Sequence, residues 1–415
     1  MTVMESIPVT MSVKNCSLSD ASRSNTVITY IKVILISSIF FQKFSFPGTS
    51  GVIPLVLPIL LLATLAGLWR GDLLISRTSV FLFSIFGGIG CFSSIFCKEN
   101  TISSLAYVVA CQSVLVTSVR QDFKISDVFD FYCNSMFLVS VLAVIQYFSQ
   151  FVINREYSFF LDYNLPQEIY LKGFNNLNPL DWDSPIIKSN GVFFPEPSIF
   201  NQFLSLAVFF EIIKRQRPLY LLCYLMGLLV SYSGTGVVML FIVLPIYLIF
   251  RASFKSFIYC TALLVFVTIF LQFIDSEFLT KRVTEVFLPN TSAHARFIAI
   301  FWVIERQLDF GVFPTFFGVG PGQIIPQDVF APFQITDPTW GKIFFEYGAL
   351  GFIIYIFYFL SFCRNTPFFI CLSLGVVYFF MGGYIAYAPI ISLLVVFLAW
   401  TPKQSDNFNA SNGTD

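Results

Sequence analysis

The chain has 415 residues, of which 56% are hydrophobic and only 12% are charged, with 24 basic and 24 acidic side chains. A soluble globular protein carries about 25% charged residues, so the composition argues against an ordinary soluble domain and indicates several membrane spans. Because the two charge signs balance, we expect no nucleic acid among the partners.

Long apolar runs recur along the whole chain. A bilayer core about 30 Å thick needs roughly 20 apolar residues per helix, so we expect an all-α polytopic membrane protein with about twelve transmembrane helices. The candidate spans are residues 27–42, 51–69, 79–97, 101–119, 128–152, 199–213, 218–233, 235–250, 256–274, 343–362, 366–381 and 383–400. The first 26 residues are polar, so the first run is expected to stay as a span and not to be cleaved as a signal peptide. At SYSGTG (231–236) and GGY (382–384), Gly is expected to allow tight turns between spans.

Basic residues distinguish the two sides of this arrangement. With the N-terminus inside, the short outer loops hold only Lys43 and Lys98. The short inner loops hold Arg70, Arg77, Arg120, Lys124, Lys214, Arg215, Arg217, Arg251, Lys255 and Arg364. The positive-inside rule therefore favours twelve spans with both termini in the cytoplasm.

The expected organisation follows from these spans. The ranges are a cytoplasmic N-terminal tail (1–26), transmembrane helices 1–5 (27–153), a first outer segment (154–198), helices 6–9 (199–274), a second outer segment (275–342), helices 10–12 (343–400) and a cytoplasmic C-terminal tail (401–415). Structureless loops as long as the outer segments are usually functional or disordered. We therefore expect the functional site between the two outer segments.

The first outer segment ends in KSNGVFFPEPSIF (188–200), where Glu196 stands between two prolines just before an apolar helix. Proline is tolerated at a helix start and fixes the backbone there. A carboxylate in this position is suited to act as a general base. The alternative is an acid placed at the helix start by the helix dipole.

The second outer segment contains SAHARFIAIFWVIERQLD (292–309), whose apolar residues Phe297, Ile300, Phe301 and Ile304 predict an amphipathic helix lying in the membrane interface. The planar guanidinium of Arg296 matches phosphate oxygens, and Arg282 and Arg306 are candidate helpers. The alternative is an interfacial arginine that snorkels to water. His294, the only histidine, is either a base or simply polar surface.

After a glycine-rich turn, FFGVGPGQ (316–323), the stretch DPTWGKIFFEYGALG (337–351) leads into the next span. The turn is only a weak candidate for a phosphate cradle. Glu346 is ionisable inside a span, which makes it a functional candidate, or it pairs with Lys342. Asp337, before Pro338, is either a helix N-cap or a second candidate base.

The nine cysteines show no metal-ligand spacing, and seven of them lie in or beside apolar runs. We interpret them as small buried hydrophobic residues, and we expect no disulfide and no metal.

Four stretches, in this order, resemble the bacterial O-antigen polymerases of the Wzy type, within the O-antigen ligase/polymerase superfamily. They are KSNGVFFPEPSIF (188–200), LLVSYSGTGVVML (228–240), Arg296 ahead of FFGVGPGQ (316–323), and FFEYGALGF (344–352). The ligase branch commonly carries a His where this chain has Asp337, which favours the polymerase. The family often has Arg at the basic position before the Gly, and here it is Lys188.

The resemblance implies a glycosyltransferase of lipopolysaccharide biosynthesis in the bacterial inner membrane, with both outer segments in the periplasm. It would join oligosaccharide repeat units carried on undecaprenyl pyrophosphate, in contact with membrane lipids and with a chain-length regulator as a partner. No cofactor or metal is implied. The candidate catalytic residues are Glu196, Asp337 and Glu346, and the candidate pyrophosphate-binding residues are Arg296, Arg282, Lys188 and Arg306.

Two other functions stay open at this point. One is the ligase, which transfers finished polymer to the lipid A core. The other is a polysaccharide flippase or other transporter, for which broken helices and paired repeats are typical.

Overall fold

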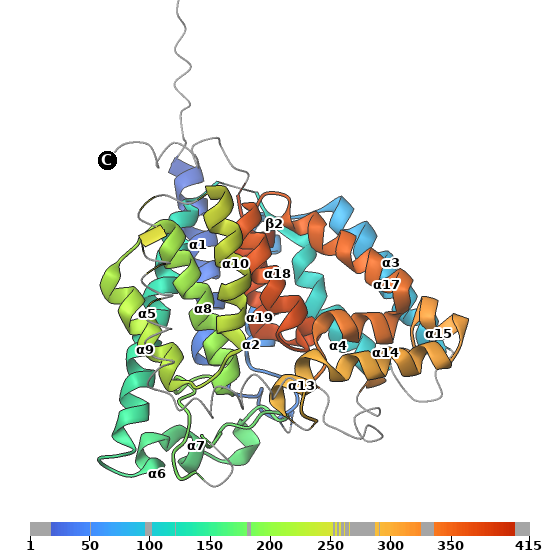
Figure 1. The fold of residues 1–415 in the computed structure, drawn as a ribbon. Coiled ribbons are helices and arrows are strands. Elements are labelled where there is room, and N and C mark those ends of the chain that lie inside the picture. Colours follow the sequence, from blue (N-terminus) through green and yellow to red (C-terminus); the bar gives the residue numbers. More distant parts are fainter. Residues whose placement is uncertain are drawn as a thin grey trace, which may run out of the picture.

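The structure is a computed structural model that describes residues 18–49, 51–95, 102–120, 122–180, 184–251, 287–289, 291–324 and 336–402, together with Phe254, Phe257, Ile258, Thr261 and Val265. These residues are mostly helical (Figure 1). Strands β1 (Leu73–Ile75) and β2 (Thr117–Val119) pair antiparallel, with Leu74 opposite Ser118. The predicted all-α class is thus correct except for this short ribbon.

Every expected span except 256–274 coincides with helical structure, and most of 256–274 lies outside the described residues. The helices are α1 (Leu18–Phe40), α2 (Val56–Trp69), α3 (Arg77–Ile95), α4 (Ile102–Ser113), α5 (Ile125–Ser149), α8 (Pro197–Lys214), α9 (Pro218–Val230), α10 (Thr235–Arg251), α17 (Thr339–Cys363), α18 (Phe368–Phe380) and α19 (Ala388–Leu394). Their positions follow from the apolar runs, because a helix satisfies its own backbone hydrogen bonds wherever water is excluded.

Within the described residues, α3, α5 and α17 are each long and apolar enough to cross a membrane. Shorter apolar helices accompany them, including α2, α9, α10 and α18. A helical protein with candidate membrane spans is therefore confirmed. The number of twelve spans and the compartment of each loop stay predictions.

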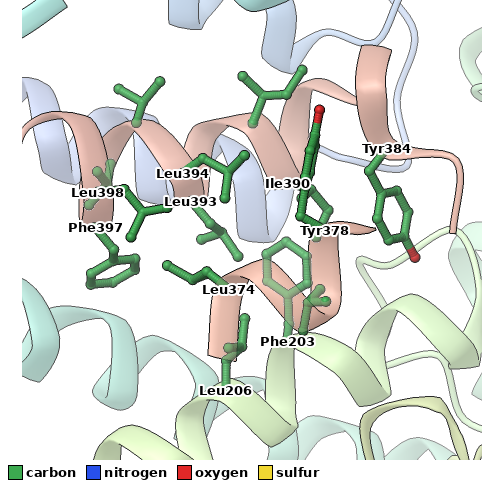
Figure 2. Packing of buried hydrophobic residues seen from close by; sticks show 14 of the residues in the cluster. Phe203, Leu206, Leu374, Tyr378, Tyr384, Ile390, Leu393, Leu394, Phe397 and Leu398 are labelled. Atoms are coloured by element: carbon green, nitrogen blue, oxygen red, sulfur yellow. The ribbon is translucent and has the colours of Figure 1, made fainter. Parts of the chain in front are cut away.

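Helix α8 lies at the centre of the helix array. All of its side chains from Ile199 to Ile212 are buried, and it packs against α5, α9, α10 and α18. Figure 2 shows its Phe203 and Leu206 meeting Leu374 of α18 and side chains of the last helix. Because side chains on all faces of α8 are buried, α8 contacts protein on every side.

The last expected span, 383–400, is not one regular helix. It begins with a 3-10 turn, η3 (Tyr384–Ala386), continues as α19, and ends as a π-helix, η4 (Val395–Ala399). Pro389 stands in the first turn of α19, where proline is compatible with a helix. The segment before it therefore cannot continue the same helix, and this leaves η3 as a separate turn.

The predicted helix 292–309 is interrupted at Ile298, which separates α13 (Ser292–Phe297) from α14 (Ala299–Asp309). The buried side of α14 consists of Ala299, Ile300, Val303 and Gln307. Of the apolar residues from which the helix was predicted, Ile300 lies on this buried side, whereas Phe301 is 57% exposed. The location of this helix in the membrane interface stays a prediction.

Helix α17 is broken at Gly348, whose φ of 72° lies in the left-handed region. The break frees carbonyl groups, and the glycine-rich turn satisfies them. The N–H groups of Val319 and Gly320 donate to the carbonyls of Phe345 and Glu346, each at 3.0 Å. The turn after α15 (Val312–Phe317) thus completes the hydrogen bonds of a broken helix, which accounts for its glycines without a bound phosphate.

Close packing at this break also requires glycine. A Cβ atom at Gly318 would lie 2.2 Å from the Glu346 carbonyl oxygen, and one at Gly348 would lie 2.3 Å from the Phe316 carbonyl oxygen. Gln307 supports the same place by donating to the carbonyls of Phe344 and Phe345, each at 3.2 Å.

Parts of both outer segments lie toward the same end of the molecule. The short helices α6 (Arg155–Ser158) and α7 (Phe160–Asn164) and helix α13 are in the lower part of Figure 1, opposite β2 and the C-terminal end. The described parts of the two segments thus lie toward one end of the helices, and their location on one side of a membrane stays a prediction.

Candidate functional site

A buried tyrosine joins the start of α8 to the 3-10 turn before α19. The Tyr384 hydroxyl donates to Gln202 Oε1 at 2.7 Å, and its backbone N–H donates to Thr339 Oγ1 at 2.7 Å. The N–H and hydroxyl of Thr339 both donate to the Gly382 carbonyl, at 2.9 and 2.8 Å. These bonds fix α8, the start of α17 and η3 relative to one another.

Helix α13 is attached to the same place. The Thr336 N–H donates to the Ala295 carbonyl at 2.8 Å, which brings Arg296 toward the start of α17. The Tyr384 hydroxyl is bonded to Gln202 of α8, six residues after Glu196. The segments that carry the two leading residues of the sequence analysis, one cation and one carboxylate, are therefore joined to the same turn at Tyr384.

Glu196 is the N-cap residue of α8, but its carboxylate does not cap the helix. Its Oε1 accepts from the Asn175 N–H at 3.2 Å, and its Oε2 accepts from the Ser198 hydroxyl at 3.0 Å. The residue is half-buried. The first outer segment thus reaches Glu196 through Asn175, and the carboxylate keeps some exposure.

Arg296 is also half-buried, and its Nε is a buried donor that lacks a hydrogen-bond partner among the described residues. In that part of the chain, no ion pair within 4.0 Å joins Arg296 to Glu196. Within the described part of the chain, the cation and the carboxylate therefore do not neutralise each other through a direct ion pair.

Gln202 supplies a second such donor. The residue is fully buried, and its Nε2 finds no acceptor in the described chain. A buried donor without an acceptor is costly, so this donor and Arg296 Nε suit a ligand rich in anionic oxygens. Sequence reasoning missed Gln202 and Tyr384. The available signal was a polar Gln inside an apolar helix.

Asp337 belongs to the same neighbourhood. Its carbonyl oxygen lies 2.9 Å from the position that a Cβ of Gly383 would take, so it contacts the turn that carries Tyr384. The N-cap of α17 is Pro338, so the predicted capping role of Asp337 is wrong. Asp337 lies one residue before this N-cap, and its role as a second candidate base stays a prediction.

Glu346 lies apart from this group. It is fully buried in α17, its carboxylate is 3.8 Å from Lys342 Nζ, and it faces the backbone of Gly322 and Ile324. The structure thus contains the i, i+4 pair that the sequence analysis gave as the structural alternative.

The remaining candidates have separate surroundings. Arg306 lies over the ring of Trp302 at 5.3 Å on α14. Lys188 is half-buried, and its N–H donates to the Asn178 carbonyl at 2.8 Å. His294 is buried, not surface-exposed. Arg282 lies outside the described residues.

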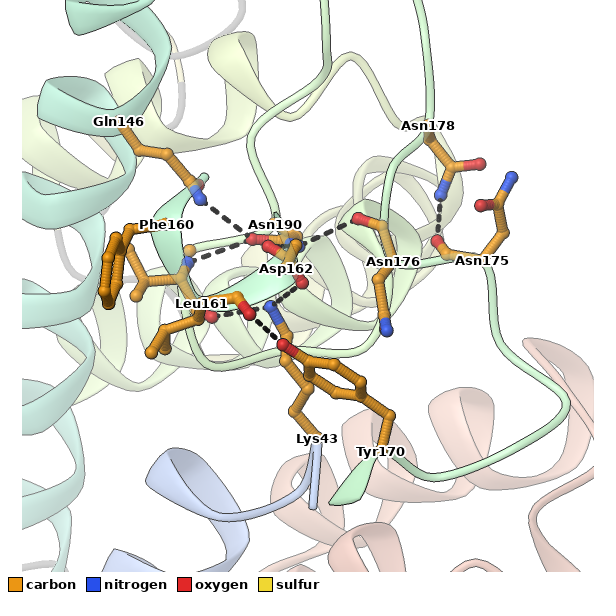
Figure 3. Close-up of polar contacts among 12 residues, drawn as sticks. Lys43, Gln146, Phe160, Leu161, Asp162, Tyr170, Asn175, Asn176, Asn178 and Asn190 are labelled. Carbon is orange, nitrogen blue, oxygen red and sulfur yellow. Dashed lines mark hydrogen bonds and ion pairs between the residues drawn. The ribbon is translucent and has the colours of Figure 1, made fainter. Parts of the chain in front are cut away.

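A buried ion pair beneath the first outer segment was not predicted (Figure 3). Lys43 Nζ lies 2.7 Å from Asp162 Oδ1, and the two side chains are 0% and 1% exposed. Burial raises the pKa of the Asp162 carboxyl, while Lys43 and Asn190 oppose that rise. The sequence analysis had counted Lys43 only as an outer-loop charge, and no sequence signal links residues so far apart.

Among the described residues, no three His, Cys, Asp or Glu side chains are placed to hold a metal ion together. The six cysteines in the same part of the chain are all free.

Comparison with known proteins adds no relationship to this picture. The sequence matches no protein-family model, and a search of curated proteins also finds no match.

Proposed function

We propose that this chain polymerises oligosaccharide repeat units carried on undecaprenyl pyrophosphate into O-antigen or a related surface polysaccharide, at the periplasmic face of the bacterial inner membrane. The observation that supports the proposal is that hydrogen bonds join helix α13, which carries Arg296, and the start of α8, which follows Glu196, to the same turn at Tyr384, with no Arg296–Glu196 ion pair among the described residues. A glycosyl transfer from a pyrophosphate needs a cation for the leaving group and a base for the attacking hydroxyl.

In the proposed reaction, the Arg296 guanidinium holds the pyrophosphate of the growing chain. An acceptor hydroxyl on the next repeat unit attacks the anomeric carbon of that chain, and Glu196 takes the hydroxyl proton. The new carbon–oxygen bond forms as the bond to the pyrophosphate oxygen breaks, and the leaving pyrophosphate carries the negative charge. Arg296 stabilises that charge as it develops, and holding both substrates at one site supplies the orientation.

The other candidates take secondary roles in the proposal. Asp337 is the second candidate base, because it contacts the turn that bears Tyr384. Lys188 and Arg282 are candidate second cations. Glu346 and Arg306 are less favoured, since Glu346 is buried beside Lys342 and Arg306 lies on aromatic rings.

The apolar helices supply the membrane part of the proposal. Helices α3, α5 and α17 have the length and composition of spans, and their lipid-facing surfaces suit the prenyl chain of the substrate. We place the chain in the inner membrane with both termini in the cytoplasm, and we expect a chain-length regulator as its partner.

A surface-polysaccharide gel from cells that lack this chain tests the proposal. A single repeat unit attached to lipid A core is the expected product. Loss of all attached sugar with accumulation of lipid-linked polymer would identify a ligase instead. Loss of attached sugar with single units trapped on the inner leaflet would identify a flippase.

Complementation connects the gel to the site. Wild-type chain should restore the polymer, and Glu196→Gln should not. The matched control is Glu168→Gln, because Glu168 is an exposed acid of the same outer segment, and this variant should restore the polymer fully.

A further inference from the structure

We propose that Lys43 is a positioning residue for Glu196, and that it acts by holding a strained backbone turn at Gly191 and Val192. The role of Glu196 as base rests on the proposed function. The link from Lys43 to Glu196 rests on the contacts of the Lys43 ammonium and of Asn190.

Lys43 makes two strong contacts inside the protein. Its ammonium lies 2.7 Å from Asp162 Oδ1 and donates to the Val192 carbonyl oxygen, also at 2.7 Å. Taking both charges of an ion pair out of water is expensive, and such a pair often stabilises a fold no better than apolar side chains do. A fully buried pair that also holds a backbone carbonyl therefore points to a positional task.

The turn that Lys43 holds is conformationally unfavourable. Val192 has φ of 69°, a left-handed value that is a genuine outlier for a β-branched residue. Gly191 before it has φ of 66°. A residue keeps such a conformation only where its surroundings impose it, and these residues cluster at functional sites. The Lys43 ammonium on the Val192 carbonyl is one such constraint.

The first connection to Glu196 is the chain itself. Only three residues separate Val192 from Glu196, and Phe194 among them is fully buried. The Phe194 ring lies 5.4 Å from the ring of Phe200 and 5.2 Å from that of Phe203. Phe194 thus joins the turn at Val192 to α8, close to the point where the chain enters the helix at Glu196.

The second connection runs through Asn190 (Figure 3). Its Nδ2 donates to Asp162 Oδ2 at 3.3 Å and to the Asn176 carbonyl at 3.0 Å, and its Oδ1 accepts the Val192 N–H at 3.1 Å. The neighbouring Asn175 N–H donates to Glu196 Oε1. One side chain therefore connects the ion pair both to the strained turn and to the loop that binds the Glu196 carboxylate.

The proposal can be tested with variants that remove or keep the backbone strain at Val192. In Lys43→Met/Asp162→Asn, both charges are removed together, so no lone charge stays buried. We expect this variant to make at least tenfold less polymer per molecule of membrane protein. Adding Val192→Gly should restore most of the polymer, because glycine adopts positive φ readily. Adding Val192→Ala, the matched control, shortens the side chain but keeps the left-handed penalty, and should not restore it.

Turnover of a purified lipid-linked repeat unit distinguishes positioning from folding. A positioning role predicts a lower kcat with little change in KM, and recovery of kcat only with glycine. Equal behaviour of the glycine and alanine variants would overturn the proposal, and so would normal polymer from Lys43→Met/Asp162→Asn.

If Lys43→Met/Asp162→Asn does not accumulate in the membrane, Lys43→Arg can be tested in its place. Arginine keeps the positive charge but replaces the compact ammonium by a planar fork, so its contact with the Val192 carbonyl should shift. We expect normal protein level, several-fold less polymer, and rescue by Val192→Gly but not by Val192→Ala. Full polymer from Lys43→Arg would refute the inference.

The proposed function and the positioning role of Lys43 can be refuted by different results. If Glu196→Gln makes full polymer, Glu196 is not the base. If Glu196→Gln is inactive while glycine and alanine at position 192 behave alike, only the positioning role of Lys43 is wrong.

Discussion

Helix α8 carries a glutamate near each end, and the two glutamates have opposite surroundings. Glu211, near the C-terminal end, is fully buried, and its two oxygens accept from Arg217 Nε at 2.9 Å and Nη2 at 2.7 Å. The Arg217 backbone N–H donates to the same carboxylate at 2.9 Å. Glu196, at the N-terminal end, accepts from Asn175 and Ser198, and among the described residues it forms no ion pair.

The difference shows what separates a structural acid from a candidate reactive one. Arg217 also donates to Asn134 Oδ1 at 3.0 Å, and its guanidinium lies 3.6 Å from the centre of the Tyr220 ring. Each of the three guanidinium nitrogens of Arg217 thus donates to an acceptor within the protein, and we call this pair with Glu211 saturated. At the other end of α8, Arg296 Nε and Gln202 Nε2 are buried donors without a hydrogen-bond partner among the described residues.

Replacing either charged residue at the N-terminal end should abolish the product. We expect Arg296→Ala and Glu196→Ala each to lower polymer at least about 100-fold, the usual scale for loss of a positioned acid–base or charge-stabilising group. Membrane protein level should stay normal, because neither side chain is in a saturated pair. A gel combined with immunoblotting measures both quantities, and full-length polymer at normal protein level would contradict the assigned role.

Breaking the saturated pair should instead damage stability. Arg217→Met leaves Glu211 buried without its partner, which costs about 3–5 kcal/mol in comparable cases. We expect a lower midpoint of unfolding in detergent and less protein in the membrane, with normal polymer per remaining molecule. A variant that is stable but inactive would place Arg217 in the chemistry and reverse the contrast.

Removing the Tyr384 hydroxyl should have a moderate effect. Tyr384→Phe deletes the hydrogen bond to Gln202 Oε1 and leaves the ring in place, and one hydrogen bond to a neutral group is worth about 0.5–1.5 kcal/mol. We expect turnover to fall by about tenfold or less. Phe at position 387 is the matched control, since the Tyr387 hydroxyl bonds Gln42 Oε1, and Tyr387→Phe should leave turnover near normal.

The exposed ion pair beside Arg217 should matter least. Arg215 binds Asp130, and the two side chains are 49% and 26% exposed, so water screens their attraction. Arg215→Met should lower the free energy of unfolding by about 1 kcal/mol or less, as measured in the same detergent titration. A loss as large as that of Arg217→Met would show that burial does not explain the contrast.

The helices were predictable from the sequence because apolar runs of nearly helical length have few other stable structures. The same holds for the start of α8, where Pro197 and the apolar residues after it place a helix locally. The break in α17 at Gly348 was not predictable, because it depends on a turn some thirty residues earlier that satisfies the freed carbonyls.

The apolar runs predicted where the helices lie, and residue type singled out the charged candidates, Glu196 and Arg296 first. The surroundings of these residues appear only in the packed chain: their segments join at the turn of Tyr384, Gln202 Nε2 is there without a partner among the described residues, and Lys43 is buried against Asp162 and Val192. The physical reason is that apolar periodicity acts over neighbouring residues. Hydrogen bonds and ion pairs between distant segments depend instead on how the whole chain packs, and residue spacing does not encode that packing.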